Sequence, residues 1–152
     1  MDSKKEDQLA MRLIEAALEA RDNAYTPYSR YSVGAAIHCI DDDSVVRGCN
    51  VENASFGATN CAERTALFAA IAQGHREFDA IAIVAGPADY SAEELEGVKD
   101  YPTPCGICRQ ALREFVHPDT FRVILAKSIT DYKVLSLSDL LPESFGPENM
   151  PR

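Results

Sequence analysis

Three of the five cysteines stand in two short motifs that restrict what this chain can fold into. Cys61 is followed by Ala-Glu, and Cys105 and Cys108 are separated by two residues in Pro-Cys-Gly-Ile-Cys. Both motifs fall at expected helix starts, where free backbone N–H groups and the helix dipole favour a thiolate over a thiol. If the two helix starts lie side by side, three soft sulfur ligands converge, which suits a tetrahedral zinc ion. We therefore predict a zinc site that joins the two segments.

The number of ligands favours a catalytic zinc over a structural one, because three protein ligands leave a fourth position for water or substrate. His38, His75 and His117 are expected in a strand, at a helix end and after a helix, away from the thiolates. Glu63 follows Cys61 by two residues and is the candidate general acid and base. Zinc acidifies bound water, and a nearby carboxylate can carry the proton away.

Arg64 is interpreted as a residue that supports the sulfur ligands. Three thiolates and one Zn²⁺ sum to a net charge of −1, which weakens the metal as a Lewis acid unless neighbouring donors draw charge from the sulfurs. Arg64 stands three residues after Cys61, within reach of such a role. An exposed arginine paired with an acidic neighbour is the alternative at this position.

Helical and strand periodicities alternate along the chain. The expected helices cover residues 4–23, 61–73 and 105–116, with shorter ones near 91–94 and 138–141. The expected strands cover residues 33–40, 45–51, 81–85, 121–127 and 134–137, the first two forming a hairpin. Helices that alternate with apolar strands predict an α/β layered fold around a largely buried sheet. The expected helix caps are Ser3 with Glu6, Thr59 or Asn60, and Thr103.

Composition limits the class of protein. A chain of 152 residues with 46% hydrophobic and 26% charged residues predicts a single globular domain, 1–152, without repeats or linkers. Fifteen Lys and Arg against twenty-four Asp and Glu give a net charge of −9, which disfavours a nucleic-acid partner. The chain has neither a secretory signal nor an apolar run of roughly 18 residues, so we expect a cytoplasmic protein without a membrane partner.

The stretch 86–101 belongs to none of the long helices, strands or cysteine motifs described above. It is strongly acidic, and Ser91 with Glu94 can cap one short helix within it. We interpret it as a solvated surface excursion.

The chain resembles the small homotetrameric zinc-dependent cytidine deaminases. The resemblance rests on Cys-Ala-Glu-Arg-Thr-Ala at 61–66, Pro-Cys-Gly-Ile-Cys-Arg-Gln at 104–110 and Asn-Val-Glu-Asn-Ala-Ser at 50–55, and it covers nearly the whole chain. It implies a three-layer α/β/α fold with a five-stranded mixed sheet, one Zn²⁺ per subunit, and a homotetramer. The acidic stretch 86–101 is longer than the corresponding link in that family.

The implied activity is hydrolytic deamination of cytidine and deoxycytidine to uridine and deoxyuridine, with release of ammonia, in pyrimidine salvage. The resemblance implies that Glu63 carries the proton to N3 of the ring and to the leaving amine. It assigns the ribose hydroxyls to Asn50 and Glu52, whose amide and carboxylate can pair with hydroxyls without attracting a phosphate. Tyr31 occupies the position of an aromatic residue that stacks on the base, where Phe is usual.

Four further residues receive roles from the same resemblance. The backbone of Ala62 is expected to bond the pyrimidine, and the carbonyl of Thr103 to lie near the amine. Phe56 falls on a substrate-lining position, and Phe145 resembles a tail aromatic that reaches the site of a neighbouring subunit. Without the resemblance, Phe56 and Phe145 would be interpreted as packing residues.

Four alternatives remain beside this interpretation. A deaminase of another cytosine compound, such as blasticidin S, shares the cysteine motifs. Deoxycytidylate and nucleic-acid deaminases usually place histidine where Cys61 stands. A non-catalytic zinc module needs four protein ligands and has no use for Glu63. A hydrolase with a cysteine nucleophile lacks a histidine in a matching motif.

Overall fold

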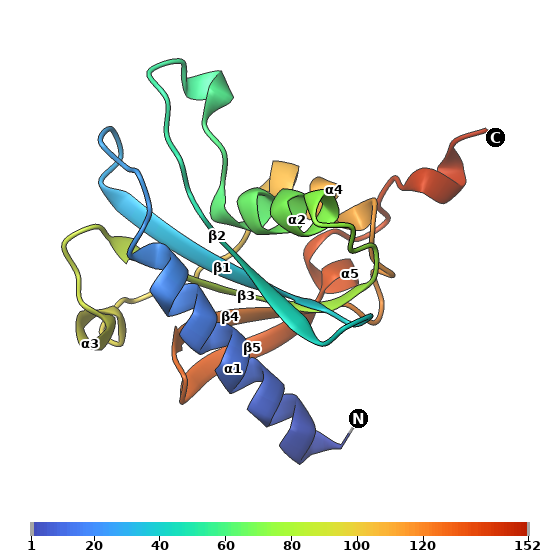
Figure 1. The fold of residues 1–152 in the computed structure, drawn as a ribbon, viewed down its shortest axis with the longest axis horizontal. Helices are drawn as coiled ribbons and strands as arrows, with labels where there is room; N and C mark the ends of the chain where they lie inside the picture. Colours follow the sequence, from blue (N-terminus) through green and yellow to red (C-terminus); the bar gives the residue numbers. More distant parts are fainter. Residues whose placement is uncertain (1, 152) are drawn as a thin grey trace.

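A five-stranded mixed sheet forms the centre of the protein in a computed structural model, which describes residues 2–151 (Figure 1). The strands are β1 (Tyr31–Cys39), β2 (Ser44–Cys49), β3 (Phe78–Pro87), β4 (Arg122–Ser128) and β5 (Asp131–Ser136), in the order β2-β1-β3-β4-β5. The β3–β4 pair is parallel, and the other three pairs are antiparallel. The predicted α/β fold with a five-stranded mixed sheet is thereby confirmed.

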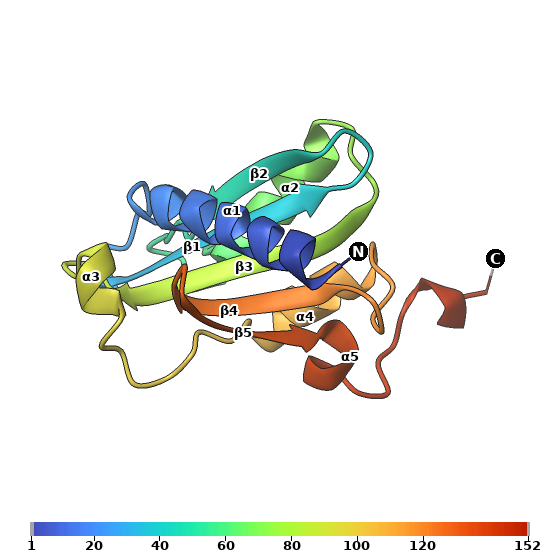
Figure 2. The same cartoon turned by 90° about the horizontal axis from the view of Figure 1, so that it is seen from below.

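Helices cover both faces of this sheet. Helix α1 (Ser3–Arg21) lies on one face, and α2 (Ala62–Ala72), α4 (Gly106–Arg113) and the short α5 (Leu137–Leu140) lie on the other (Figure 2). The one-turn helix α3 (Ala92–Leu95) lies at the end of the sheet where β3 stops, and 3₁₀ turns occupy Phe56–Ala58 and Pro147–Asn149. Within residues 2–151, none of the helices combines the length and apolarity required of a bilayer span.

The strand sequences alternate between two hydrophobic cores, since successive side chains of a strand point to opposite faces. Large side chains such as Ile37, Ile81 and Leu125 pack with α2 and α4. The face toward α1 is lined mainly by alanines, including Ala36, Ala80, Ala82 and Ala126. Small residues there let α1 approach the sheet closely. At Gly34 of β1, an added Cβ would lie 2.0 Å from the carbonyl oxygen of Ala17.

Helix starts differ from the expected ones in a way that matters for the site. Asp2, not Ser3, caps α1, because its side chain accepts a hydrogen bond from the backbone N–H of Lys5. Helices α2 and α4 begin one residue later than expected, so Cys61 and Cys105 are themselves the N-cap residues. Both have extended backbone angles and neither makes a side-chain cap hydrogen bond. The predicted caps at residues 59, 60 and 103 are therefore wrong.

The candidate active site and its metal centre

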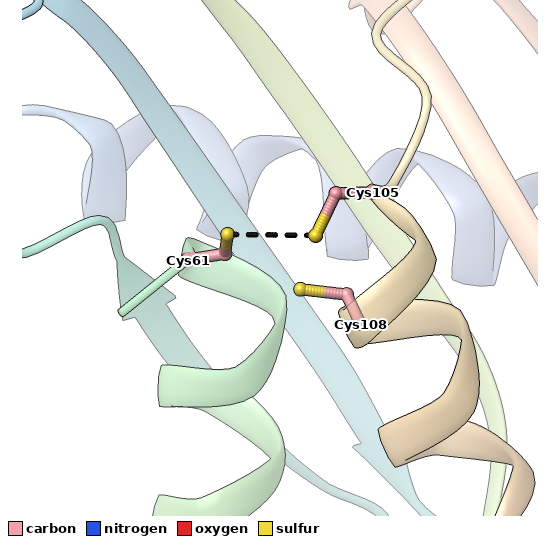
Figure 3. A group of neighbouring side chains, drawn as sticks. All are labelled: Cys61, Cys105 and Cys108. Carbon is pink, nitrogen blue, oxygen red and sulfur yellow. Dashed lines mark hydrogen bonds between the residues drawn. The ribbon is translucent and has the colours of Figure 1, made fainter. Parts of the chain in front are cut away.

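The three cysteines of the two motifs meet at the starts of α2 and α4, as Figure 3 shows. Their sulfur atoms all lie within 4.8 Å of one another, and those of Cys61 and Cys105 are 3.8 Å apart. A tetrahedral zinc ion with Zn–S bonds of about 2.3 Å requires sulfur atoms about 3.8 Å apart. All five cysteines are free, so no disulfide competes for these sulfurs. The donor set and its spacing therefore fit zinc.

Arg64 points its guanidinium at this sulfur cluster. Its Nη2 donates to Sγ of Cys61 at 3.5 Å, and the buried Nε has no hydrogen-bond partner within residues 2–151. The structure therefore places Arg64 where a cation can stabilise the charge of a thiolate at Cys61. Hydrogen bonds to the cysteine sulfurs in turn raise the pKa of Arg64.

Hydrogen bonding sets the charge within the cluster. Hydrogen bonding with the side chain of Cys108, and then with those of Arg64 and Cys105, lowers the pKa of Cys61 to about 5. The same hydrogen bond, together with burial, raises the pKa of Cys108. The lowered pKa favours the thiolate form of Cys61, which is the form that binds metal.

Glu63 is buried beside the cluster, with only 4% of its surface exposed. It lies in the first turn of α2 and lines the same cavity as Cys61 and Cys105. Burial, followed by the negative charge of Cys61, raises the pKa of Glu63 to about 7. A carboxyl group with a pKa near neutrality can both accept and release a proton. The structure therefore brings Glu63 to the metal ligands as predicted.

A cavity of about 630 Å³ opens in front of these residues. One wall consists of the start of β1 and the segment after β2, a second of the start of α2, and a third of residues 98–103. The predicted residues that line it are Tyr31, Asn50, Glu52, Ala62, Glu63 and Thr103. Its size is that of a small-molecule site.

Asn50 and Glu52 lie on one wall and are held by backbone contacts. The side-chain oxygen of Asn50 accepts from the N–H of Val33 at 3.0 Å, and its amide nitrogen donates to the carbonyl of Tyr31 at 2.9 Å. Glu52 accepts from the backbone N–H of Tyr28, at 3.0 Å, and from the backbone N–H and hydroxyl of Ser29. The Ser29 hydroxyl contributes most to lowering the pKa of Glu52. Both side chains are therefore fixed before any ligand binds.

Tyr31 begins β1 at the edge of the cavity and remains 44% exposed. Its partial burial raises the pKa of the phenol, so the hydroxyl is neutral. The Asn50 contact to its carbonyl fixes the backbone of Tyr31 on the same wall as Glu52.

Phe56 and Phe145 lie outside the main cavity. Phe56 is 74% exposed and packs edge-on against Tyr28, with ring centroids 5.8 Å apart, over a neighbouring hollow of about 370 Å³. Phe145 belongs to the C-terminal tail and is 57% exposed, and its carbonyl accepts a hydrogen bond from Gln110 of α4. A single chain therefore does not bring either ring to the zinc ligands.

Two groups of site residues were not predicted from the sequence. Ser29 buttresses Glu52 through its hydroxyl, and residues Val98–Pro102 form part of the cavity wall. Ser29 carried a signal, because it sits in a loop of aromatic and hydroxyl residues before β1. The acidic stretch 86–101, predicted to be a solvated excursion, instead turns its last residues toward the cavity, and only its capped helix at Ser91 and Glu94 follows the expectation.

Comparison with known proteins decides the family. Residues 6–124 match the model described as the cytidine and deoxycytidylate deaminase zinc-binding region, a span that includes the three cysteines, Glu63 and Arg64. The chain belongs to this family. As a zinc-binding deaminase, it uses Zn²⁺ as its cofactor, and the sulfur cluster is where its residues can hold the ion.

Individual members of the zinc-binding deaminase family are similar over most of their length. A protein named cytidine deaminase from Halalkalibacterium halodurans is 46% identical over 138 residues, which cover 91% of this chain and 95% of the relative. The crystal structure of cytidine deaminase from Burkholderia pseudomallei has a TM-score of 0.76 at 47% identity and covers 88% of this chain and 97% of that chain. A Bacillus cereus protein named blasticidin-S deaminase is 31% identical over 117 residues, 77% of this chain and 79% of the relative.

Proposed function

We propose that this protein hydrolyses cytidine and deoxycytidine to uridine and deoxyuridine and releases ammonia. The observation that carries the proposal is the convergence of three sulfur atoms, within 4.8 Å of one another, beside the buried carboxyl group of Glu63. Both features face a cavity of about 630 Å³ that has the size required for a nucleoside. Relatives named cytidine deaminase, which are 46% and 47% identical over the aligned part of the chain, support this substrate class.

The residues of this chain divide the chemistry among them. Cys61, Cys105 and Cys108 would hold zinc, which supplies a Lewis acid that makes a water molecule nucleophilic near neutral pH. Glu63 takes one proton from the attacking water and gives it to N3 of the base. It then carries the second proton of that water, released as the C4 carbonyl forms, to the leaving amine, so that ammonia departs while N3 stays protonated. Its burial keeps bulk water from competing for that proton. Arg64 donates to the sulfur of Cys61 and thereby holds the ligand in place.

The wall that carries Asn50 and Glu52 would bind the sugar hydroxyls. Each side chain is already held by backbone groups, so binding requires little ordering. Each also retains hydrogen-bonding capacity: a carboxylate offers about four lone-pair sites, and the Asn50 amide keeps a second N–H. A carboxylate at this place repels a phosphate group, which favours nucleosides over nucleotides.

The base would lie beside Tyr31 of the first wall, against the other two walls. Tyr31 at the cavity edge offers its ring for stacking. Ala62 and Thr103 line the cavity from the start of α2 and from the third wall, where their backbone groups can bond the pyrimidine and its amine. Backbone donors and acceptors that are fixed by a helix start and a short loop suit such recognition.

We further propose that the protein forms a homotetramer in which Phe145 of one copy, and the loop around Phe56, complete the cavity of another. Large apolar side chains on the surface of one chain support an assembly. They include Phe56 at 74%, Ile107 at 65%, Phe145 at 57% and Phe68 at 48% exposed. A role in pyrimidine salvage in the cytoplasm is consistent with five unpaired cysteines, which such a reducing compartment preserves.

The first experiment is to incubate the zinc-loaded protein separately with cytidine, deoxycytidine, CMP and blasticidin S. Loss of the cytosine absorbance and release of ammonia report the reaction, and light scattering of the same sample reports the number of chains. We expect both nucleosides to react, CMP to be inert, and a particle of four chains.

Any other result of this assay would contradict one specific part of the proposal. Conversion of blasticidin S alone would leave the deaminase chemistry and overturn the substrate. Preferential conversion of CMP would overturn the role of the Glu52 wall in rejecting phosphate. A zinc-loaded protein that converts none of the four compounds would favour a structural zinc module.

A further inference from the structure

The third wall of the cavity belongs to a long connection between β3 and α4. It leaves the sheet at Pro87, makes the single turn α3, and then runs as an irregular segment past Val98 and Thr103 to Cys105 (Figure 2). Irregular connections of this length are ordinarily mobile unless side chains tie them down. The contacts of the segment therefore decide whether its wall is already formed before a ligand binds.

The first part of the connection is held by Arg21 at the end of α1. Arg21 is only 7% exposed, and its guanidinium donates to the carbonyls of Gly86, Pro87 and Tyr90. Leu95 of α3 is 1% exposed, and it covers Gly86 so closely that an added Cβ there would lie 2.3 Å from its side chain. The start of the connection is thus part of the core rather than a free loop.

The last part of the connection is held by the β4–β5 hairpin through Tyr101. The Tyr101 hydroxyl donates to Oδ1 of Asp131 at 2.6 Å. Its ring lies under two ammonium groups, with Nζ of Lys127 at 4.5 Å and Nζ of Lys133 at 5.2 Å from the centroid. Lys127 also donates to the carbonyl of Lys99 at 3.1 Å. Three residues from the far edge of the sheet therefore converge on one side chain of the wall.

These contacts join the cavity wall to the β4–β5 hairpin, which carries none of the residues proposed to bind zinc or substrate or to transfer a proton. We propose that Tyr101 is a positioning residue: through Asp131 and the two lysines, it holds residues 98–103 in the place against which the nucleoside binds. The inference rests on the proposed function of the same cavity. Tyr101 carries no reacting atom. Its effect is on the fraction of molecules in which residues 98–103 have the conformation that binds the nucleoside.

A wall that is held in place lowers the ordering cost of binding, and loosening it weakens substrate and transition state alike. Weaker binding of this kind raises KM and leaves kcat nearly unchanged, because the wall makes the same interactions with the bound substrate and with the transition state. A purely structural tyrosine would instead lower thermal stability without this division between KM and kcat. The two roles are therefore separable by kinetics.

The test compares Tyr101→Phe, Asp131→Asn and the double variant with the zinc-loaded wild type. Tyr101→Phe keeps the ring under the lysines and removes only the hydroxyl. We expect each single variant to raise KM for cytidine about 3- to 10-fold, the effect of one hydrogen bond, with kcat within about 2-fold. The double variant should be no worse than either single one, because both remove the same bond. Zinc content, measured on each sample, should not change.

Tyr90→Phe is the matched control. Tyr90 lies in the same connection, but its hydroxyl makes no hydrogen bond in the part of the chain that the structure describes, and its carbonyl contact to Arg21 survives the change. We expect this variant to keep the KM of the wild type. An unchanged KM in Tyr101→Phe, or a loss confined to kcat or to thermal stability, would overturn the positioning role.

Hydrogen exchange of the amides of residues 98–103 separates this inference from the proposed function. An active wild type whose wall exchanges no faster in Tyr101→Phe would refute the inference and leave the function intact. A wild type that does not convert cytidine would refute the function and with it the positioning of a nucleoside. Faster exchange of the wall in Tyr101→Phe but not in Tyr90→Phe, together with the raised KM, is the result we expect.

Discussion

The sulfur atoms of Cys61 and Cys105 lie 3.8 Å apart, although 44 positions separate the two residues along the chain. The sheet makes this contact possible, because α2 and α4 cover the same face and begin at the same end of it. The metal site is thus a product of the fold rather than of either motif alone.

Replacing Cys105 by alanine should strip the protein of zinc, because two sulfurs cannot complete the site that three form. Metal analysis after dialysis should find about one zinc per chain in the wild type and far less in the variant. Cys49→Ala is the control, since this free cysteine lies in β2 outside the cluster. Equal zinc contents in the two variants would mean that the metal is bound elsewhere.

Glu63→Gln should separate catalysis from metal binding. The amide keeps the size of the side chain but cannot take a proton, and general acid–base catalysis contributes about 100- to 10,000-fold in rate. We expect kcat to fall by that range while zinc content stays at the wild-type level. The matched control is Glu96→Gln, an exposed residue at the end of α3. A Glu63→Gln variant of normal activity would remove this residue from the mechanism.

Arg64→Gln should weaken the site without abolishing it. The change removes the donor to Cys61, and loss of a group that supports a metal ligand typically costs about 10- to 100-fold in metal affinity or activity. Chelator competition measures the affinity, and the deamination assay measures the rate. Arg76→Gln, beyond the other end of α2, is the control because, among the residues that the structure describes, its guanidinium bonds only the local carbonyls of Ile71 and His75. If the two variants behave alike, Arg64 is an ordinary surface arginine.

The stability of the β1–β2 hairpin, which lies away from the sulfur cluster, should depend on pH through Asp43. Asp43 accepts from His38, at 2.7 Å, and from Arg12, and the His38 contact contributes most to lowering the pKa of Asp43. A carboxyl group whose pKa is lowered on folding stabilises the native state above its unfolded pKa and loses this effect as the pH falls through its folded pKa.

Asp43→Asn should therefore lower Tm at neutral pH, and the difference from the wild type should shrink as the pH drops below about 4. Asp89→Asn supplies the comparison, since within residues 2–151 its side chain makes no hydrogen bond or ion pair. A deficit in Tm that stayed the same at all pH values would argue against the charge of Asp43.

Gly34→Ala should destabilise the contact between α1 and the sheet. The new methyl group would lie 2.0 Å from the carbonyl oxygen of Ala17, so the helix must shift, at a cost of about 1–3 kcal/mol. Urea unfolding measures the change. Gly57→Ala is matched to it, because an added Cβ at that position meets no atom within 4 Å. Equal midpoints for the two variants would show that α1 adjusts freely.

The sequence was informative wherever chemistry and periodicity pointed to the same place. Short apolar runs that alternate with helical segments predicted a buried sheet. The cysteine spacing predicted a ligand set, and the structure brings its three sulfur atoms together. The sequence also placed Glu63 and Arg64 in the first turn of a helix beside Cys61, but it did not indicate that Glu63 is buried.

What the sequence did not predict depends on contacts between distant segments. Nothing near Tyr101 indicates that its hydroxyl meets Asp131, because that pairing follows from the packing of the β3–α4 connection against β5. The helix caps were mistaken because polar residues such as Thr59 and Thr103 have the higher cap propensity, whereas Cys61 and Cys105 occupy the cap positions in the structure. The amide of Asn50 is likewise engaged by the backbone of β1, which only the sheet register defines.

The absence of side-chain caps on α2 and α4 has a consequence for folding. A serine or aspartate in place of Cys61 or Cys105 would stabilise its helix by about 1 kcal/mol, and each cysteine forgoes that contribution. Without metal, the two helix starts are therefore among the places where the native structure should fray first. Binding of the ion would lock both starts at once, so that heat resistance and readiness for catalysis should rise together during maturation of the enzyme.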